Sequence, residues 1–281
     1  MTNKICIAGA GTMGCGIAFC AAQNGFDTIL FDTNNNVLLN AKNSVKKNLD
    51  FLIEKNKITS EEKSAILQRF IFTVDINDCV APLIIEAIVE KPEIKISLFN
   101  QLAAINESSS IFASNTSSLS INLLQEGIPN PERVAGMHFF NPAQIMKLVE
   151  VVKAKQTSDA AIETIMEVCK QMKKTAVLCI DAPGFIVNRV ARHYYLEAMK
   201  LVELGIATFE NIDEIMEATG FKMGPFKLMD LIGMDINLAV STSLYEAFNH
   251  EPRFEPSPIQ INKVKDGELG KKTGRGFYSY S

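Results

Sequence analysis

The sequence predicts an α/β protein whose first domain is a doubly wound, mainly parallel sheet and whose second domain is all-helical. Short apolar runs typical of buried strands alternate with helical stretches as far as residue 180. Beyond Asp181 the alternation stops, and only helical patterns follow. We expect the boundary at Pro183-Gly184, which gives domains 1–183 and 184–281.

A glycine-rich turn follows the first predicted strand and opens the first helix. Gly9, Gly11 and Gly14 have the spacing G-x-G-x-x-G. The first glycine permits a tight turn, the second lets the backbone approach a pyrophosphate, and the third lets helix and strand pack closely. The helix N-terminus then offers N–H groups and a positive dipole end to the phosphates. This context predicts a Rossmann-like dinucleotide-binding domain.

Asp32 ends the second predicted strand, 18 residues beyond Gly14. A carboxylate there accepts hydrogen bonds from the ribose hydroxyls and repels a 2′-phosphate. Residues 33–36 contain no Arg or Lys that could neutralise such a phosphate, so the sequence favours NAD(H) over NADP(H). Without the glycine pattern, Asp32 would read as an exposed carboxylate at a strand end.

The remaining elements follow from the same patterns. Thr59 and Glu62 form a capping box, and the charged segment of about 40–70 predicts a helical hairpin that projects from the sheet. Further strands are expected at 71–74, 83–89, 111–114, 134–139, 148–152 and 176–180, and helices at 92–104 and 158–173. In the second domain, helices are expected at 185–204, 209–219, from Pro225 onward, at 235–249 and at 259–265.

Composition excludes several classes of partner. A formal net charge of −4 and a pI near 5.6 provide no basic field for nucleic acid or an anionic membrane. The six cysteines contain no C-x-x-C pair and read as reduced core residues of a cytoplasmic protein. The uncharged run 5–22 carries the nucleotide-binding glycines, so we reject a signal peptide or membrane helix there.

His138 and Glu150 are the first candidates for chemistry. His138 lies at the end of a predicted strand, where open parallel sheets bind their ligands, and Glu150 is a carboxylate flanked by apolar residues. A buried Glu must be paired, and beside a His it would hold the imidazole in one tautomer. On residue type alone, a partly buried structural histidine is the commoner case. The three histidines are too far apart for a short metal motif, and we expect no metal site.

Two polar positions complete the candidate site. Residues 114–118, Ser-Asn-Thr-Ser-Ser, directly follow an apolar strand, and they either donate to a substrate oxygen or cap a helix. Asn188 opens the first helix of the second domain, where it either faces a cleft between the domains or is an exposed amide.

These residues lie in motifs that, taken together, resemble those of the short-chain 3-hydroxyacyl-CoA dehydrogenases of the 3-hydroxybutyryl-CoA type, over essentially the whole chain. The motifs are GAGTMG (9–14), EAIVE (86–90), ASNTSSLSI (113–121), GMHFFNP with KLVEV (136–151), DAPGFIVNR (181–189), MGPF (223–226) and the GKKTGRGFY tail. The resemblance implies an NAD-dependent oxidoreductase that interconverts (S)-3-hydroxyacyl-CoA and 3-oxoacyl-CoA. It also implies a homodimer formed through the helical domain.

The resemblance implies a role for each site residue. His138 would be the acid/base, Glu150 would orient it, and Ser117 and Asn188 would hold the 3-oxygen of the substrate. The implied cofactor residues are Gly9, Gly11, Thr12, Met13, Gly14, Asp32, Glu90, Lys95 and Asn115. The family's hairpin touches CoA, for which Lys55 is the candidate here.

The sequence leaves two candidates for the group that carries the acyl chain. The hairpin carries Lys46, Lys47, Lys55 and Lys57, which suit CoA phosphates. Asp50 and Phe51, however, occupy a face where another basic residue is expected, so a thioester bound to a carrier protein is the alternative substrate.

Two rival functions are weaker. A hydrolase could use Ser117, His138 and Glu150, but the serine lacks a G-x-S-x-G elbow. A non-catalytic NAD-binding protein could retain the fold, but a decayed site would have lost at least one of the four candidate residues. The length of the acyl chain, the physiological direction of the reaction and its metabolic pathway stay open.

Overall fold

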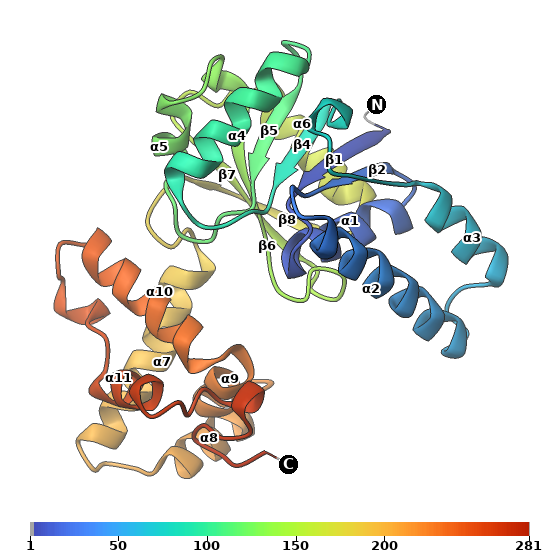
Figure 1. Ribbon diagram of the computed structural model, residues 1–281. Coiled ribbons are helices and arrows are strands. Elements are labelled where there is room, and N and C mark those ends of the chain that lie inside the picture. The colour runs from blue at the N-terminus through green and yellow to red at the C-terminus, as the bar shows by residue number, and fades with distance from the viewer. Residues whose placement is uncertain (1–2, 281) are drawn as a thin grey trace. The chain divides into compact units, whose positions relative to one another are not determined.

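The computed structural model describes residues 3–280, which divide into two compact units on either side of the Asp181–Ala182 bond. The first unit is built on one eight-stranded sheet with the order β3-β2-β1-β4-β5-β6-β7-β8 (Figure 1). All neighbouring strands are parallel except β6 and β7. The doubly wound, mainly parallel sheet predicted from the sequence is confirmed. The strands are β1 Lys4–Ala8, β2 Asp27–Phe31, β3 Phe70–Thr73, β4 Leu83–Glu86, β5 Ile111–Ser114, β6 Val134–Phe139, β7 Leu148–Lys153 and β8 Thr175–Ile180.

Helices cover both faces of this sheet because successive apolar side chains along each strand point to opposite faces. Ile5 and Ile7 of β1 belong to the core cluster that includes α1 (Thr12–Gln23) and α6 (Asp159–Gln171). On the opposite face, Phe112 of β5 packs against Phe99 with ring centroids 5.6 Å apart. The other helices of the unit are α2 Asn35–Glu54, α3 Ser60–Gln68, α4 Pro92–Ile105 and α5 Ile121–Glu126, with 3₁₀ turns at Ile76–Asp78 and Pro131–Arg133.

The helices α2 and α3 form the predicted hairpin and extend away from the sheet (Figure 1). Thr59 and Glu62 make both bonds of the predicted capping box. The first helix is longer than expected because Asn34 caps it: its side chain accepts a hydrogen bond from the N–H of Asn36 at 2.9 Å. Beyond Leu49 this helix has no fully buried residue, so its distal end is bound by few core contacts.

Several predicted boundaries differ from the observed ones by one to three residues, and two of these differences have local reasons. The strand expected over 83–89 ends at Glu86, because the Glu86 carboxylate accepts a hydrogen bond from the N–H of Ile88 and turns the chain. The helix expected from Phe185 begins at Val187, because Phe185 has a left-handed φ of 48°.

The second unit is built from helices and 3₁₀ turns, with isolated β-bridges in its tail between Gly270 and Arg275 and between Arg275 and Ser279. Its helices are α7 Val187–Glu203, α8 Phe209–Ala218, α9 Pro225–Ile232, α10 Met234–Ala247 and α11 Pro258–Lys265, with 3₁₀ turns at Pro252–Phe254 and Lys271–Thr273. Its core cluster includes Tyr195, Met199, Phe226, Met229 and Met234. Within residues 3–280, no helix is long and apolar enough to cross a membrane.

Two buried carboxylates attach the C-terminal tail to this unit. Asp230 accepts hydrogen bonds from the N–H groups of Phe277 and Tyr278, both at 3.0 Å, and from the Tyr280 hydroxyl at 2.9 Å. Asp213 accepts from the Tyr278 hydroxyl at 2.8 Å. A Cβ on Gly276 would lie only 2.0 Å from an Asp230 oxygen, so the tail needs glycine at that position.

Candidate active site

The glycine loop joins β1 to α1, and its geometry differs at each glycine as the sequence predicts. Gly9 has φ +108°, and a Cβ there would lie 2.6 Å from the Ala87 carbonyl oxygen. A Cβ on Gly14 would lie 1.7 Å from the Gly9 carbonyl oxygen, so only glycine lets the helix start this close to the strand. A Cβ on Gly11 would meet no atom within 4 Å, which leaves open space beside the backbone where a pyrophosphate would lie.

The N-terminus of α1 suits an anion. Gly11 is its N-cap and has no side chain to occupy the amides of the first turn, which also contains no acidic residue. Thr12 is exposed and Met13 is half-buried at this end of the helix. Amides and helix dipole together therefore fit the phosphates of a dinucleotide.

Asp32 lies directly beyond β2, and its carboxylate braces this loop. Oδ2 accepts a hydrogen bond from the N–H of Ala10 at 2.9 Å, and Oδ1 accepts from the N–H of Asn34 at 2.9 Å. The side chain remains partly exposed, so it can still accept bonds from a ribose. Residues 33–36 are all exposed and carry no positive charge.

The chain reverses its direction of winding between β1 and β4, which are neighbours in the sheet. Ligands of open α/β sheets bind beyond the carboxyl ends of the strands at this switch point. Ala8, Glu86 and Ser114 end β1, β4 and β5, and they lie in one row with Gly136, from which β6 continues beyond this row to Phe139. The glycine loop and the 115–118 segment follow this row directly.

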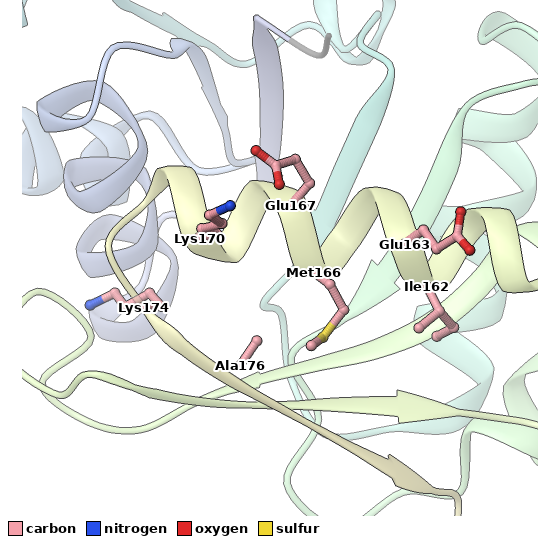
Figure 2. A pocket seen from close by; sticks show the side chains of 7 residues that line it. All are labelled: Ile162, Glu163, Met166, Glu167, Lys170, Lys174 and Ala176. Atoms are coloured by element: carbon pink, nitrogen blue, oxygen red, sulfur yellow. The ribbon is translucent and has the colours of Figure 1, made fainter.

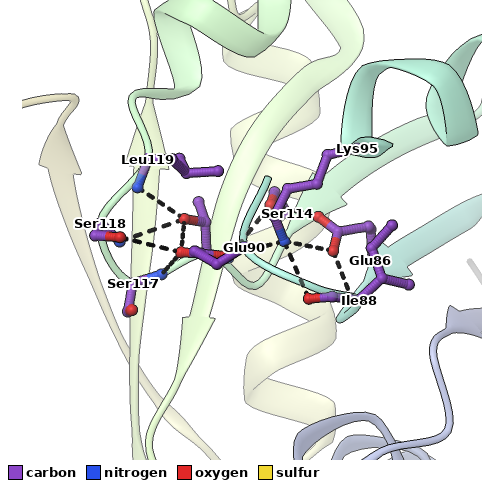
Figure 3. A network of polar contacts seen from close by, with 9 residues as sticks. Glu86, Ile88, Glu90, Lys95, Ser114, Ser117, Ser118 and Leu119 are labelled. Carbon is purple, nitrogen blue, oxygen red and sulfur yellow. Dashed lines mark hydrogen bonds and ion pairs between the residues drawn. The ribbon is translucent and has the colours of Figure 1, made fainter. Parts of the chain in front are cut away.

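Glu90 and Lys95 belong to a network of polar contacts at this edge (Figure 3). The Lys95 side chain is almost fully buried, and its Nζ lies 2.6 Å from Glu86 Oε1 and 3.1 Å from Glu90 Oε2. Glu90 in turn accepts hydrogen bonds from the Thr116 hydroxyl and from the N–H of Ser117 at 3.1 Å. Burial raises the pKa of Glu90, but the Lys95 charge and these hydrogen bonds outweigh burial and hold it below its usual value.

Ser117 and Asn115 lie on the segment that this network holds. The Asn115 side-chain oxygen accepts a hydrogen bond from the N–H of Phe139 at 2.8 Å, and its own N–H donates to the Glu86 carbonyl at 2.8 Å. Asn115 therefore connects the ends of β4 and β6. The helix cap considered for residues 114–118 is instead formed by Ser120, whose side chain caps α5.

His138 and Glu150 lie directly opposite each other on the antiparallel strands β6 and β7. His138 Nδ1 is 2.8 Å from Glu150 Oε2, and both side chains are buried, at 7% and 1% exposure. The Phe140 ring lies beside the imidazole, with centroids 4.6 Å apart. A carboxylate at Nδ1 fixes the orientation of the ring and leaves Nε2 as the nitrogen that can exchange a proton with a ligand.

The remaining predicted residues belong to other elements of the chain. Asn188 is a half-buried residue in the first turn of α7, in the second unit, so its place beside His138 stays a prediction. Lys55 follows α2 at the exposed tip of the hairpin, with its Nζ 5.5 Å from the centre of the Phe51 ring. Asp50 on the same helix forms an ion pair with Lys63 of α3.

Sequence reasoning missed Glu86 and Thr116 as individual site residues. Glu86 stands at the end of the apolar run LIIE, so the argument applied to Glu150, that a buried carboxylate must be paired, could have identified it. Thr116 is 1% exposed and carried no distinguishing signal within a polar segment.

A pocket of about 420 Å³ lies on another part of the first unit (Figure 2). Its lining comes from α6, from Lys174 and from Ala176 of β8, and none of the lining residues is a predicted site residue. Among residues 3–280, no three His, Cys, Asp or Glu side chains are grouped so that they could hold a metal ion.

Comparison with known proteins gives the same picture for both units. Residues 4–182 match the family described as "3-hydroxyacyl-CoA dehydrogenase, NAD binding domain", and residues 184–280 match "3-hydroxyacyl-CoA dehydrogenase, C-terminal domain".

Individual relatives align over nearly all of the chain. The chain is 44% identical to the 3-hydroxyadipyl-CoA dehydrogenase of Escherichia coli, over 99% of the chain but only 59% of that longer protein. It is 40% identical to a probable 3-hydroxybutyryl-CoA dehydrogenase of Deinococcus radiodurans, over 99% of this chain and 100% of that one. The crystal structure of (S)-3-hydroxybutyryl-CoA dehydrogenase from Ralstonia eutropha superposes with a TM-score of 0.96 at 36% identity and covers 100% of both chains. With its NAD-binding unit and its helical unit both matched, the chain belongs to the 3-hydroxyacyl-CoA dehydrogenase family.

Proposed function

We propose that this protein catalyses the reversible, NAD(H)-dependent oxidation of an (S)-3-hydroxyacyl-CoA to the 3-oxoacyl-CoA. The observation that carries the proposal is the buried His138–Glu150 pair, which lies at the same edge of the sheet as the glycine loop. This edge therefore combines a proton-exchanging group with a dinucleotide fold. That combination is what oxidation of a secondary alcohol requires.

In the oxidation direction, His138 Nε2 takes the proton of the 3-hydroxyl group. Bound NAD supplies the acceptor for the hydride that leaves C3. Glu150 stabilises the imidazolium that forms, because its carboxylate lies 2.8 Å from Nδ1. In the reduction direction, the same imidazolium returns the proton to the oxygen at C3.

Ser117 and Asn188 would hold that oxygen. A hydroxyl and an amide donate hydrogen bonds to an oxygen as it gains negative charge, and donors fixed in advance stabilise the charge most strongly. Support for the Ser117 role comes from its segment, which is tied to Glu90 and follows β5. The Asn188 role rests on the family resemblance.

The acyl group is proposed to be short, as in 3-hydroxybutyryl-CoA and acetoacetyl-CoA. Two named relatives act on 3-hydroxybutyryl-CoA, whereas the E. coli relative is named for 3-hydroxyadipyl-CoA, so both acyl groups belong in a substrate panel. CoA is favoured over a carrier protein because Lys63 neutralises Asp50, which removes the acidic charge that weighed against CoA on the hairpin. The exposed Lys46, Lys47, Lys55 and Lys57 then remain to meet its phosphates.

The protein is also proposed to form a homodimer through the second unit. Several large apolar side chains there are more than half exposed and could be buried against a second copy of the chain. They are Leu204, Ile206, Ile215 and Leu231. Sedimentation velocity would report a dimer, and Ile206→Glu should shift it toward the monomer. The six cysteines, all free and five of them buried, support the proposal of a reducing compartment such as the cytoplasm.

The direct test follows the absorbance of reduced nicotinamide in the presence of acetoacetyl-CoA, with NADH and then with NADPH. We expect rapid oxidation of NADH and a slower rate with NADPH, because Asp32 repels a 2′-phosphate. If NADH binds but neither acetoacetyl-CoA nor 3-oxoadipyl-CoA is reduced, the same thioesters on an acyl carrier protein decide between the carrier-bound substrate and a non-catalytic NAD-binding protein.

A further inference from the structure

Glu86 is a buried carboxylate to which no role is assigned by the proposed function. It ends β4 with an exposure of 0%, and both of its oxygens are occupied. Oε1 accepts from the N–H of Ile88 at 2.7 Å and from Lys95 Nζ at 2.6 Å, and Oε2 accepts from the Ser114 hydroxyl at 2.7 Å. A side chain without exposed surface does not touch a substrate, so any effect it has must act through its neighbours.

Lys95 links Glu86 to Glu90. Its side chain is 1% exposed, and its ammonium group contacts both carboxylates and, at 3.5 Å, the carbonyl of Ile88. A buried ammonium held at two carboxylates has little freedom to move. Glu90, whose side chain is 37% exposed, is therefore fixed from its buried side.

Glu90 fixes the segment that carries Ser117. One of its oxygens, Oε1, accepts hydrogen bonds from the Thr116 hydroxyl, from the N–H of Ser117 at 3.1 Å and from the Ser118 hydroxyl at 3.2 Å (Figure 3). The Thr116 hydroxyl also accepts from the N–H of Leu119 at 2.9 Å. The 116–119 turn is thus organised around one carboxylate oxygen and one hydroxyl.

We propose that Glu86 is a positioning residue: through Lys95 and Glu90, its buried carboxylate fixes the 116–119 turn and so sets the position of Ser117. The kinetic part of this inference rests on the proposed function. The structural part, that Glu86 orders the turn, does not.

The arrangement is poorly suited to stability alone. Burying an ion pair removes both charges from water, and apolar residues of similar size often stabilise a protein as much or more. Glu86 is also connected to the segment that follows β4, through Ile88, and to the end of β5, through Ser114. A group that holds two ligand-facing segments at once gains from being rigid and charged, because it limits where both can lie.

The first experiment measures amide hydrogen exchange in the purified full-length Glu86→Gln variant by mass spectrometry. Gln is close to Glu in size, but it places an uncharged amide at Lys95 and weakens the chain of contacts. We expect exchange in the 116–119 turn to become about tenfold faster, as the loss of one charge-assisted hydrogen bond implies. The strands β1 and β6 should exchange as in the wild type.

Asp78→Asn is the matched control. Asp78 is a carboxylate that follows β3 and accepts a hydrogen bond from the Thr73 hydroxyl, and three strands separate β3 from β5, after which the 116–119 turn lies. It should leave exchange at 116–119 unchanged. Equal exchange of the turn in Glu86→Gln and the wild type would overturn the inference, whether or not the protein reduces acetoacetyl-CoA.

The second experiment is a kinetic cycle with Ser117→Ala. If Glu86 acts through Ser117, Glu86→Gln should lower kcat about tenfold in the wild-type background but by less than threefold when Ser117 is already Ala, since coupled residues are non-additive. If the two substitutions lower kcat independently, so that their fold-losses multiply in the double variant, Glu86 has a general structural role and the inference is wrong. An inactive wild-type protein would contradict the proposed function alone and leave the exchange result to decide the inference.

A milder variant serves if Glu86→Gln fails to fold. Thr116→Val preserves shape and leaves every buried charge paired, yet it removes the hydroxyl bond to Glu90. It should loosen the 116–119 turn in the same exchange measurement. An unchanged turn in this variant would also contradict the inference.

Discussion

Buried carboxylates hold together the functional edge of the first unit and the C-terminal tail of the second, but their partners differ. Glu86 and Glu150 lie against a lysine and a histidine, groups that carry or can gain a proton. Asp213 and Asp230 lie against backbone N–H groups and tyrosine hydroxyls. The first arrangement suits chemistry and positioning, whereas the second only attaches one piece of chain to another. Substitutions should therefore reduce turnover in one unit and stability in the other.

The largest effect is expected at His138. His138→Ala removes the group proposed to exchange the proton and should lower kcat about a hundred- to ten-thousandfold, the usual contribution of a positioned acid/base. NADH affinity, measured by fluorescence titration, should change little. His250→Asn is the control, because His250 is exposed with φ +63°, a conformation that asparagine tolerates. Equal losses of turnover and NADH binding in His138→Ala would argue against the assigned role.

Asp230 provides the contrast in the second unit. Asp230→Ala removes the acceptor of two N–H groups and one hydroxyl, and should lower the free energy of unfolding by about 3 kcal/mol or more. Urea denaturation measures this loss, and the exposed Asp266→Ala serves as control. In the folded variant, NADH affinity should remain that of the wild type. A variant that keeps wild-type stability but binds NADH poorly would contradict the assignment of a purely structural role to Asp230.

Asp32 should show an intermediate effect. Asp32→Ser removes the charge proposed to face the ribose and the carboxylate oxygen that accepts the Ala10 N–H, so the KM for NADH should rise about tenfold and the preference for NADH over NADPH should become smaller. Asp27→Asn, at the exposed start of the same strand, should change neither. An unaltered ratio of NADH to NADPH rates would remove Asp32 as the determinant of cofactor choice.

The smallest effect is a pH dependence in the second unit. Burial raises the pKa of Tyr278 and Tyr280, and their hydrogen bonds to Asp213 and Asp230 raise it further. An unfolded tyrosine ionises near pH 10, so the stability gained from these phenols is complete below about pH 10 and is lost as pH rises through their folded pKa values.

The variant with Tyr278→Phe and Tyr280→Phe should therefore lose less stability than the wild type between about pH 9 and pH 11. Urea midpoints across this range provide the measurement. If the urea midpoints of the variant and the wild type fall in parallel with pH, the two phenols have the same pKa in the folded and the unfolded protein.

Most of the fold was predictable because its signals are local. The glycine spacing, the capping box of Thr59 and Glu62, and the apolar runs at 111–114 and 134–139 depend on neighbouring residues only. The strand at 148–152 was predicted, but its antiparallel direction was not, although the connection 140–147 is too short for the helical crossover that a parallel neighbour needs. Helix α5 was missed because its six residues are too few to establish a period.

The site was predictable where a motif or an isolated charge marked it. His138 and Glu150 lie beside each other because their strands are antiparallel, a register that the sequence does not encode locally. Glu86 was missed because its partner Lys95 stands on the next helix, and a lysine in a helix usually faces solvent. The sequence can indicate that a buried carboxylate is paired, but which distant residue pairs with it is visible only after the chain is folded.

The most direct test of the central claim is to reduce acetoacetyl-CoA with NADH that carries deuterium at the transferred position and to analyse the thioester product by mass spectrometry and NMR. Hydride transfer to C3 predicts 3-hydroxybutyryl-CoA with the deuterium bound at C3. A reduced product without deuterium at C3, or no product from a protein that binds both NADH and acetoacetyl-CoA, would contradict the account.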